Sequence, residues 1–479
     1  SPPLFCLTSG ARLMEDYGMN RHLLHLYHSL PPFAQSAAAT VRGWNLRRWR
    51  YGPETDTLVA EAVDRESWSA EQWRLFRSRR LEQLLRRAAL SVPYYRQYWA
   101  SRSGAARRDW ESLENWPILE KETVRARPMD FLADDCRVRD MFPEHTSGSS
   151  GTPLQLWWSR ETTRRWYGLF EARWRNWYGV SRHDRWGILG GQRIIPARRT
   201  APPYWVWNAS MNQLYLSAFH MSPESMGSYL DAIHARQLRY LWGYSSSLQQ
   251  LANFAISIGR TIPLHVVITN AEPLYSFQRE AIERAFACPV RETYGMAEIV
   301  AAASECAEGS LHLWPEVGIA EVLDGVSPVL PGRPGDLVAT GIHNLDMPLI
   351  RYRTGDRVVL SSEERKCSCG RRLPILESVE GRTDDFIICS DGRRIGRIDP
   401  LFKVGLPIRE AQVIQRRVGQ LEVRFVPAGQ FCQIHLNALD QRFRDFLGPM
   451  DYTFSSVDEI PKKENGKFQS VVSLIDDHG

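Results

Sequence analysis

The chain has 479 residues, of which 43% are hydrophobic and 24% are charged, and its formal net charge at pH 7 is +5. This length predicts two or more domains, the composition argues against disorder, and the small, dispersed charge argues against a nucleic-acid-binding protein. No run of about eighteen apolar residues is present, which argues against a transmembrane segment, and eight cysteines are too few for a disulfide scaffold, which favours a reducing, cytoplasmic location.

Two arginine-rich stretches come first along the chain. Residues 42–50 and 74–87 hold clustered arginines with tryptophans among them. We favour the solvated faces of amphipathic helices as the interpretation, and a surface that meets a membrane or a partner is the alternative. Apolar side chains at helical spacing predict a helix over residues 79–91, which Pro93 should end.

Residues 145–153 are the most unusual stretch, because hydroxyl residues and glycines alternate there with no apolar side chain to bury. Gly148 and Gly151 allow the backbone to approach an anion closely, and the hydroxyls supply donors. We interpret this stretch as a phosphate-binding loop, although its composition is also typical of a flexible surface loop. It lacks the Gly-Lys-Ser/Thr ending of the common triphosphate-binding loop. The candidate phosphate-binding residues are Thr146, Ser147, Gly148, Ser149, Ser150, Gly151 and Thr152.

Helices and strands alternate in the next region. The expected elements are a helix that Ser245 caps and Gly259 ends, a strand over residues 264–268, a helix over 277–286 and a strand over 290–293. This alternation predicts a parallel sheet with right-handed crossovers. Ligands bind beyond the carboxyl ends of such strands, so we expect residues 270–273 and 294–298 to face one crevice.

Shorter apolar pieces, broken by prolines and glycines, predict a small β subdomain over residues 318–338. Polar motifs lie on both sides of this region. They are Tyr294-Gly295-Met296-Ala297-Glu298, Arg351-Tyr352-Arg353-Thr354-Gly355-Asp356, Gly381-Arg382-Thr383-Asp384-Asp385 and Pro461-Lys462-Lys463-Glu464-Asn465-Gly466-Lys467.

Four residues form a candidate metal site: Cys306, His312, Cys367 and Cys369. Thiolate and imidazole are the preferred tetrahedral ligands of zinc. The Cys-x-Cys pair is similar to a metal knuckle, although its spacing is tighter than the usual two intervening residues, and buried inert thiols are an equal alternative for the pair alone. Four protein ligands would leave no open position, so the zinc would be structural.

The phosphate-binding loop and the four polar motifs, in this order, resemble the motifs of the adenylate-forming superfamily, which activates carboxylic acids with ATP. A closer resemblance, over nearly the whole chain, is to the phenylacetate-CoA ligase family. Residues 344–352 and 411–415 place the chain nearer to the branch found with capsule and exopolysaccharide genes. The resemblance is carried further by residues 81–96, 242–248 and 367–371.

The resemblance implies an α/β, adenylate-forming ligase fold. Residues 1–383 would form a large N-terminal domain with layered sheets and the small β subdomain, and residues 384–479 a mobile α+β C-terminal lid hinged at Asp384. It implies an enzyme that uses ATP and Mg²⁺ to convert a small carboxylic acid to its acyl-adenylate. The acyl group would pass to CoA, or alternatively to an amine or hydroxyl. A catalytically degenerate nucleotide-binding scaffold is the alternative of another class.

The resemblance also implies a role for each motif. Tyr294, followed by Gly295 and Met296, would flank the adenine, and Asp356 would accept both ribose hydroxyls. Residues 146–152 would hold the leaving phosphates, in a loop that ends in Thr152-Pro153-Leu154 where many members of the superfamily place a lysine.

The catalytic residues implied in this way are Glu298, Arg382 and Lys467. Glu298 would help to bind Mg²⁺, which prefers carboxylate oxygen. Arg382 would reach the ribose or the phosphates, and Lys467 would stabilise the transition state of adenylation. Some relatives carry zinc on the four cysteine and histidine positions named above.

Three aromatic residues, Tyr204, Trp205 and Trp207, offer one indication of the acid. They would line an apolar pocket for an aromatic acid, or they would be ordinary loop and core residues.

Overall fold

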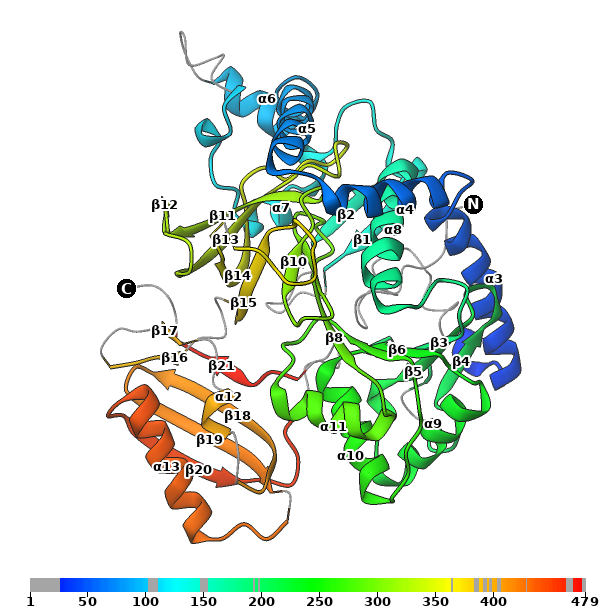
Figure 1. Cartoon of the computed structure of the whole chain (residues 1–479), viewed down its shortest axis with the longest axis vertical. Coiled ribbons are helices and arrows are strands. Elements are labelled where there is room, and N and C mark those ends of the chain that lie inside the picture. The colour runs from blue at the N-terminus through cyan, green and yellow to red at the C-terminus, as the bar shows by residue number, and fades with distance from the viewer. Residues whose placement is uncertain are drawn as a thin grey trace.

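A sheet of thirteen strands, with helices on both faces, dominates the described part of the chain (Figure 1). The computed structural model describes residues 26–475 except for 102–110, 147–153, 193, 197–198, 363–364, 383–386, 391–393, 396–398, 403–405, 428 and 462–467. The strand order across the sheet is β12-β11-β13-β14-β15-β10-β9-β8-β7-β6-β3-β5-β4. The strands are β3 (Trp186–Gly190), β4 (Trp205–Asn208), β5 (Gln213–Ser217), β6 (Tyr240–Gly243), β7 (Val266–Thr269), β8 (Val290–Gly295), β9 (Ala302–Glu305), β10 (Leu311–Leu313), β11 (Gly318–Asp324), β12 (Ser327–Pro328), β13 (Pro334–Gly341), β14 (Tyr352–Leu360) and β15 (Ile375–Arg382).

One half of this sheet is parallel, as the alternation of helices and strands predicts. Strands β5, β3, β6, β7 and β8 pair in parallel, and β4 closes the edge antiparallel to β5. Every residue of β6 and β7 is buried, which is expected where helices cover both faces of a parallel sheet.

Alternate residues of these strands pack into two different hydrophobic cores. Leu241 and Val267 pack against α9 (Pro223–Ala235), α10 (Ser245–Ser257) and α11 (Ser276–Phe286). Trp242 and Ile268, one residue further along, pack on the opposite face against α3 (Pro32–Arg50), α4 (Thr55–Asp64) and α8 (Arg160–Trp174). Successive side chains of a strand point to opposite faces of the sheet, so each face of these strands packs against its own layer of helices (Figure 1).

The other half of the sheet is antiparallel from β8 to β12. The predicted β subdomain corresponds to β11, β12 and β13, which continue the same hydrogen-bonded sheet. A third core lies between this half and α5 (Ala70–Ser91), α6 (Pro93–Ala100) and α7 (Lys121–Ala126). In this core Tyr95 donates a hydrogen bond to Pro348 O at 3.2 Å and accepts one from Ile350 N at 3.1 Å.

The C-terminal part has its own sheet, with the order β20-β19-β18-β21. Its core is separate from the others and includes Val413, Phe425 and Phe443. The elements are β16 (Ile387–Ile388), β17 (Arg394–Ile395), α12 (Asp399–Phe402), β18 (Ile408–Arg417), β19 (Gln420–Pro427), α13 (Gln433–Leu447), β20 (Asp451–Ser456) and β21 (Val471–Ser473). The predicted boundary at residue 384 falls within 383–386, outside the described residues, so the division into domains stays a prediction.

Several local predictions can be compared with the structure. The helix predicted over residues 79–91 lies within α5, and Pro93 both ends it and begins α6. The prediction that Ser245 caps α10 is wrong, because Tyr244 is the N-cap residue and no side chain at that position accepts a hydrogen bond. Gly259 follows the end of this helix with φ +66°, as predicted.

The two arginine-rich stretches lie in helices, α3 and α5, with Leu46 and Trp73 buried on their inner sides. None of the helices in the described ranges combines the length and the hydropathy needed to cross a bilayer. A separate two-stranded sheet pairs β1 (Phe142–His145) with β2 (Gln155–Trp158). Short 3-10 helices lie at Arg65–Ser67, Leu113–Asn115, Pro128–Phe131, Val138–Asp140, Asn176–Tyr178, Ala209–Met211 and Ala218–His220.

Candidate active site

The carboxyl ends of β6, β7 and β8 meet at one edge of the sheet. Gly243 pairs with Thr269, and Thr269 pairs with Glu292, so the segments that follow these strands start side by side. Residues 270–273 and 294–298 therefore come from neighbouring strands at the same edge, as the sequence predicts.

Tyr294 and Asp356 are in direct contact although 62 positions separate them. The Tyr294 hydroxyl donates a hydrogen bond to Asp356 Oδ2 at 2.7 Å. In the pairing of β14 with β15, Asp356 lies opposite Arg382. Three of the predicted motifs thus meet here, and a carboxylate stands beside an aromatic ring, which suits a ribose next to a purine base.

Glu298 is buried, with 7% of its surface exposed, at the end of the motif that begins with Tyr294. Its Oε1 accepts a hydrogen bond from the Tyr352 hydroxyl at 2.9 Å and lies 3.1 Å from Lys121 Nζ. Burial raises the pKa of Glu298, but the Lys121 charge and these hydrogen bonds outweigh it and leave the pKa below its ordinary value. Glu298 is therefore an ionised buried carboxylate, the kind of group that attracts a divalent cation.

Sequence reasoning missed Lys121 and Tyr352 as partners of Glu298. Lys121 is the first residue of a six-residue helix, 177 positions before Glu298. Tyr352 lies within a motif that we had recognised, but no local signal shows which way its hydroxyl points. The neighbouring Arg351 binds Glu321 instead, at 3.0 Å, so it supports the framework.

Some predicted site residues cannot be placed. Residues 147–152 and Lys467 lie outside the described residues, and of Arg382 only the backbone is described. Thr146 is described: its N–H donates to Leu154 O at 3.2 Å, and its hydroxyl accepts from Leu154 N at 3.0 Å. These two bonds join the ends of the predicted phosphate-binding loop.

The predicted metal ligands do come together. The ligand atoms of Cys306, His312, Cys367 and Cys369 all lie within 4.8 Å of one another. Cys306 Sγ is 3.7 Å from Cys367 Sγ, and Cys369 Sγ is 3.3 Å from His312 Nε2. Tetrahedral zinc with Zn–S of about 2.3 Å and Zn–N of about 2.0 Å would separate two sulfurs by about 3.8 Å and sulfur from nitrogen by about 3.5 Å. The donor set and its spacing therefore fit zinc.

The surroundings of this cluster hold its ligands in place. His312 Nδ1 lies 3.2 Å from Leu373 O, and donation of its proton there leaves Nε2 directed at the cluster. Arg371 follows Cys369 by two residues. Its Nε donates a hydrogen bond to Glu66 Oε2 at 2.9 Å, and its Cζ lies 4.0 Å from the centroid of the Trp177 ring. The segment that carries both Cys367 and Cys369 is thus bound to the helical layer.

Strand β15 separates the cluster from the crevice. Its first residue, Ile375, pairs with His312, and its last, Arg382, pairs with Asp356. Seven steps along a strand cover about 23 Å. At that distance the cluster cannot contact a nucleotide bound at Asp356, which agrees with a structural role.

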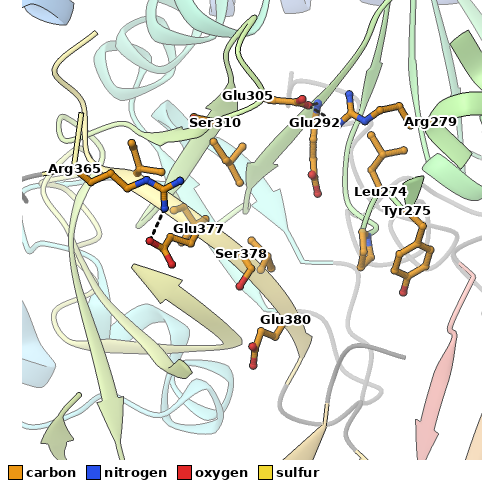
Figure 2. Close-up of a pocket in the computed structure, with 16 residues that line it drawn as sticks. Leu274, Tyr275, Arg279, Glu292, Glu305, Ser310, Arg365, Glu377, Ser378 and Glu380 are labelled. Carbon is orange, nitrogen blue, oxygen red and sulfur yellow. Dashed lines mark hydrogen bonds and ion pairs between the residues drawn. The ribbon is translucent and has the colours of Figure 1, made fainter. Parts of the chain in front are cut away.

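A cavity of about 190 Å³ lies beside the crevice (Figure 2). Arg279 and Arg365 line it, and both are already paired, with Glu305 at 2.9 Å and with Glu377 at 2.6 Å. Glu292 and Glu380 also line it, so carboxylates outnumber the arginines. The cavity is smaller than the usual ligand pocket of about 300 Å³ or more, and its surplus of carboxylates suits a phosphate poorly.

The three aromatic residues considered for an acid pocket pack otherwise. Tyr204 is buried and stacks on Tyr229, with ring centroids 5.9 Å apart. Trp205 packs at the margin of the same core, and Arg236 lies over the ring of Trp207 at 4.8 Å. These contacts favour ordinary packing.

The sheet, the C-terminal α+β part and the crevice motifs define the fold of the adenylate-forming CoA ligases, as the sequence predicts. Among solved structures, 2-hydroxyisobutyryl-CoA ligase in the postadenylation state is similar with a TM-score of 0.64 and 20% identity, over 85% of this chain and 91% of that chain. Residues 387–474 match the family model described as the CapK C-terminal domain.

Two curated relatives are similar over most of the chain. Protein CapK of Staphylococcus aureus is 24% identical over 380 residues, which cover 76% of this chain and 81% of that protein. The phenylacetate-coenzyme A ligase of Escherichia coli (strain K12) is 24% identical over 341 residues, which cover 67% and 74%. The predicted resemblance to phenylacetate-CoA ligases is confirmed by these relatives.

Proposed function

We propose that the protein is an ATP-dependent ligase that activates a carboxylic acid as its acyl-adenylate and transfers the acyl group to CoA. The observation that carries this proposal is the meeting of Tyr294, Glu298 and Asp356 at the carboxyl edge of the parallel sheet, in a fold shared with adenylate-forming CoA ligases. Relatives named as CoA ligases support it.

In the first half-reaction a carboxylate oxygen attacks the α-phosphorus of ATP, and pyrophosphate leaves. Asp356, with Tyr294 fixing one of its oxygens, would accept the ribose hydroxyls and so hold the nucleotide in register. Lys467 would meet the charge that develops on the phosphate in the transition state. Residues 146–152 would hold the leaving pyrophosphate.

Mg²⁺ would neutralise phosphate charge and would be held by the ionised carboxylate of Glu298. Lys121 and Tyr352 both contact Oε1 of this carboxylate. Tyr352 and Lys121 keep the carboxylate ionised and oriented.

In the second half-reaction the CoA sulfur attacks the acyl carbon, and AMP leaves. Arg382 would contact the ribose or phosphate of the nucleotide from the end of β15. We propose that residues 384–479 form a lid that rotates between the two half-reactions, and that Cys306, His312, Cys367 and Cys369 hold one structural zinc. We also propose a cytoplasmic location, where ATP and CoA are supplied.

The test is exchange of labelled pyrophosphate into ATP across a panel of aryl, fatty, hydroxy and amino acids. The proposal requires acid-dependent exchange, followed by thioester formation when CoA is added. No exchange with any acid would overturn it in favour of a nucleotide-binding scaffold. Exchange without thioester formation, together with product from an amine or hydroxyl acceptor, would correct the acceptor.

A further inference from the structure

The carboxylate of Glu272 bonds to two parts of the chain that are far apart in sequence. Its Oε2 accepts a hydrogen bond from Ser246 N at 2.9 Å, at the first turn of α10, and lies 3.2 Å from Ser245 Oγ, whose single proton has a nearer acceptor in Pro273 O at 2.7 Å. Its Oε1 accepts a hydrogen bond from Phe468 N at 2.8 Å, across 196 positions. Glu272 thus caps α10 from a neighbouring loop and binds the segment that follows Lys467.

The two contacts support each other. An anion at the N-terminus of α10 is favoured by the unpaired N–H groups and by the helix dipole, which fixes the orientation of the Glu272 side chain. With Oε2 fixed in this way, Oε1 is directed at Phe468 N. Only a carboxylate has two acceptor oxygens for the two backbone donors, since an amide has one.

Residues 468–470 lie between the large sheet and the C-terminal sheet. On one side, Tyr275 Oη is 3.2 Å from Ser470 Oγ, which adds a second contact from the loop that carries Glu272. On the other side, Gln412 Nε2 donates to Gln469 O at 2.9 Å and Val413 N donates to Ser470 O at 2.8 Å. The segment therefore belongs to the C-terminal sheet and is held at the crevice by the loop after β7.

We propose that Glu272 is a positioning residue for adenylation, which holds the segment next to Lys467 against the crevice. This inference rests on the proposed function, in which Lys467 stabilises the first transition state. Glu272 does not act on the substrate in this scheme. It acts through Lys467, whose carbonyl carbon is bonded to the Phe468 nitrogen that Glu272 binds.

The test compares the two half-reactions in Glu272→Ala and Glu272→Gln. Glu272→Ala should lower acid-dependent pyrophosphate exchange about tenfold or more, because a hydrogen bond to a charged group is lost. Glu272→Gln should lose less, since its amide oxygen still accepts one of the two donors. Transfer of the acyl group from a synthetic acyl-adenylate to CoA should change less than about twofold in both. Glu280→Ala, which removes an exposed carboxylate on α11, is the matched control and should leave both half-reactions unchanged.

A double-mutant comparison separates positioning from general damage to the fold. If Glu272 acts through Lys467, adding Glu272→Ala to Lys467→Ala should lower exchange no further. Multiplicative losses, equal losses in both half-reactions, or an unchanged exchange rate in Glu272→Ala would each overturn the inference while leaving the proposed function standing. A wild-type protein without acid-dependent exchange would instead overturn the proposed function, and this inference with it.

Discussion

The ion pair between Lys121 and Glu298 gives a prediction about stability that needs no knowledge of the substrate. Lys121→Met removes the positive charge and keeps much of the side-chain length. Removal of one partner of a buried ion pair destabilises a protein by about 3–5 kcal/mol. Tyr352 still donates to Glu298, and the Lys121 side chain is 21% exposed, so we expect a loss at or just below the lower limit of this range, about 2–3 kcal/mol near neutral pH.

The loss should depend on pH, with a sign set by Glu298. Burial and then the Lys121 charge are the main influences on its pKa, which is below the ordinary 4.5 in the wild type. The ionised group therefore contributes stability above pH 4.5, and this contribution is lost as the pH falls through the lowered pKa. In Lys121→Met burial is no longer opposed by this charge, the pKa rises, and protonation relieves the unpaired charge. The deficit relative to wild type should thus shrink as the pH falls towards about 4.5.

Thermal unfolding midpoints of wild type, Lys121→Met and Lys121→Arg, measured near neutral pH and near pH 4.5, check this reasoning. Lys121→Arg keeps the charge and should stay close to the wild type at both values. Mg²⁺ with nucleotide should stabilise Lys121→Met more than the wild type, because a cation replaces the missing ammonium. A deficit that is equal at both pH values, or larger in acid, would show that Glu298 is not the partner that matters.

Three further predictions concern the proposed sites. Purified protein should contain about one zinc per chain by elemental analysis, and changing Cys367 and Cys369 to Ser should remove it and lower the melting temperature; zinc that persists in this variant would contradict the ligand set. Asp356→Ala should weaken ATP binding by one to two orders of magnitude in calorimetry with the fold intact, since each lost bond to a charged group is worth about 1.5 to 3 kcal/mol, and an unchanged affinity would refute the assignment. Lys467→Ala should lower adenylation by about a hundredfold or more while acyl transfer from a synthetic acyl-adenylate continues, and an equal fall in both would contradict a rotating lid.

Patterns within a short stretch of sequence predicted the elements of the sheet well. The α10 and α11 helices and the β7 and β8 strands all lie close to their expected positions, because periodic apolar residues with glycine or proline at the ends determine such elements locally. The prediction of the residue that caps α10 was wrong for a physical reason. Ser245 has the right side chain, but the carboxylate of Glu272 approaches from another loop and accepts the hydrogen bond instead.

The same distinction applies to the candidate site. The strand pattern predicted that residues 270–273 and 294–298 face one crevice, and the family resemblance implied that Asp356 binds the same nucleotide as Tyr294. The partners of Glu298 were not predictable from the sequence. Lys121, for example, contacts it from the short helix α7, 177 positions earlier in the chain. Contacts between residues more than a hundred positions apart depend on how the helices pack against the sheet. Patterns within a short stretch of sequence do not indicate this packing.

The pairing at the end of β15 has a consequence for the reaction intermediate. Arg382 is the last residue of this strand, and it is paired with Asp356 in the large sheet. If the C-terminal sheet rotates as proposed, this pairing keeps Arg382 with the large sheet, whereas Lys467, which follows later in the chain, would move with the lid. The ribose of an acyl-adenylate would keep its contacts with the large sheet. At its phosphate, Lys467 would leave and the thiol would approach. The intermediate could thus stay bound from its formation to its consumption, protected from loss to hydrolysis in the solvent.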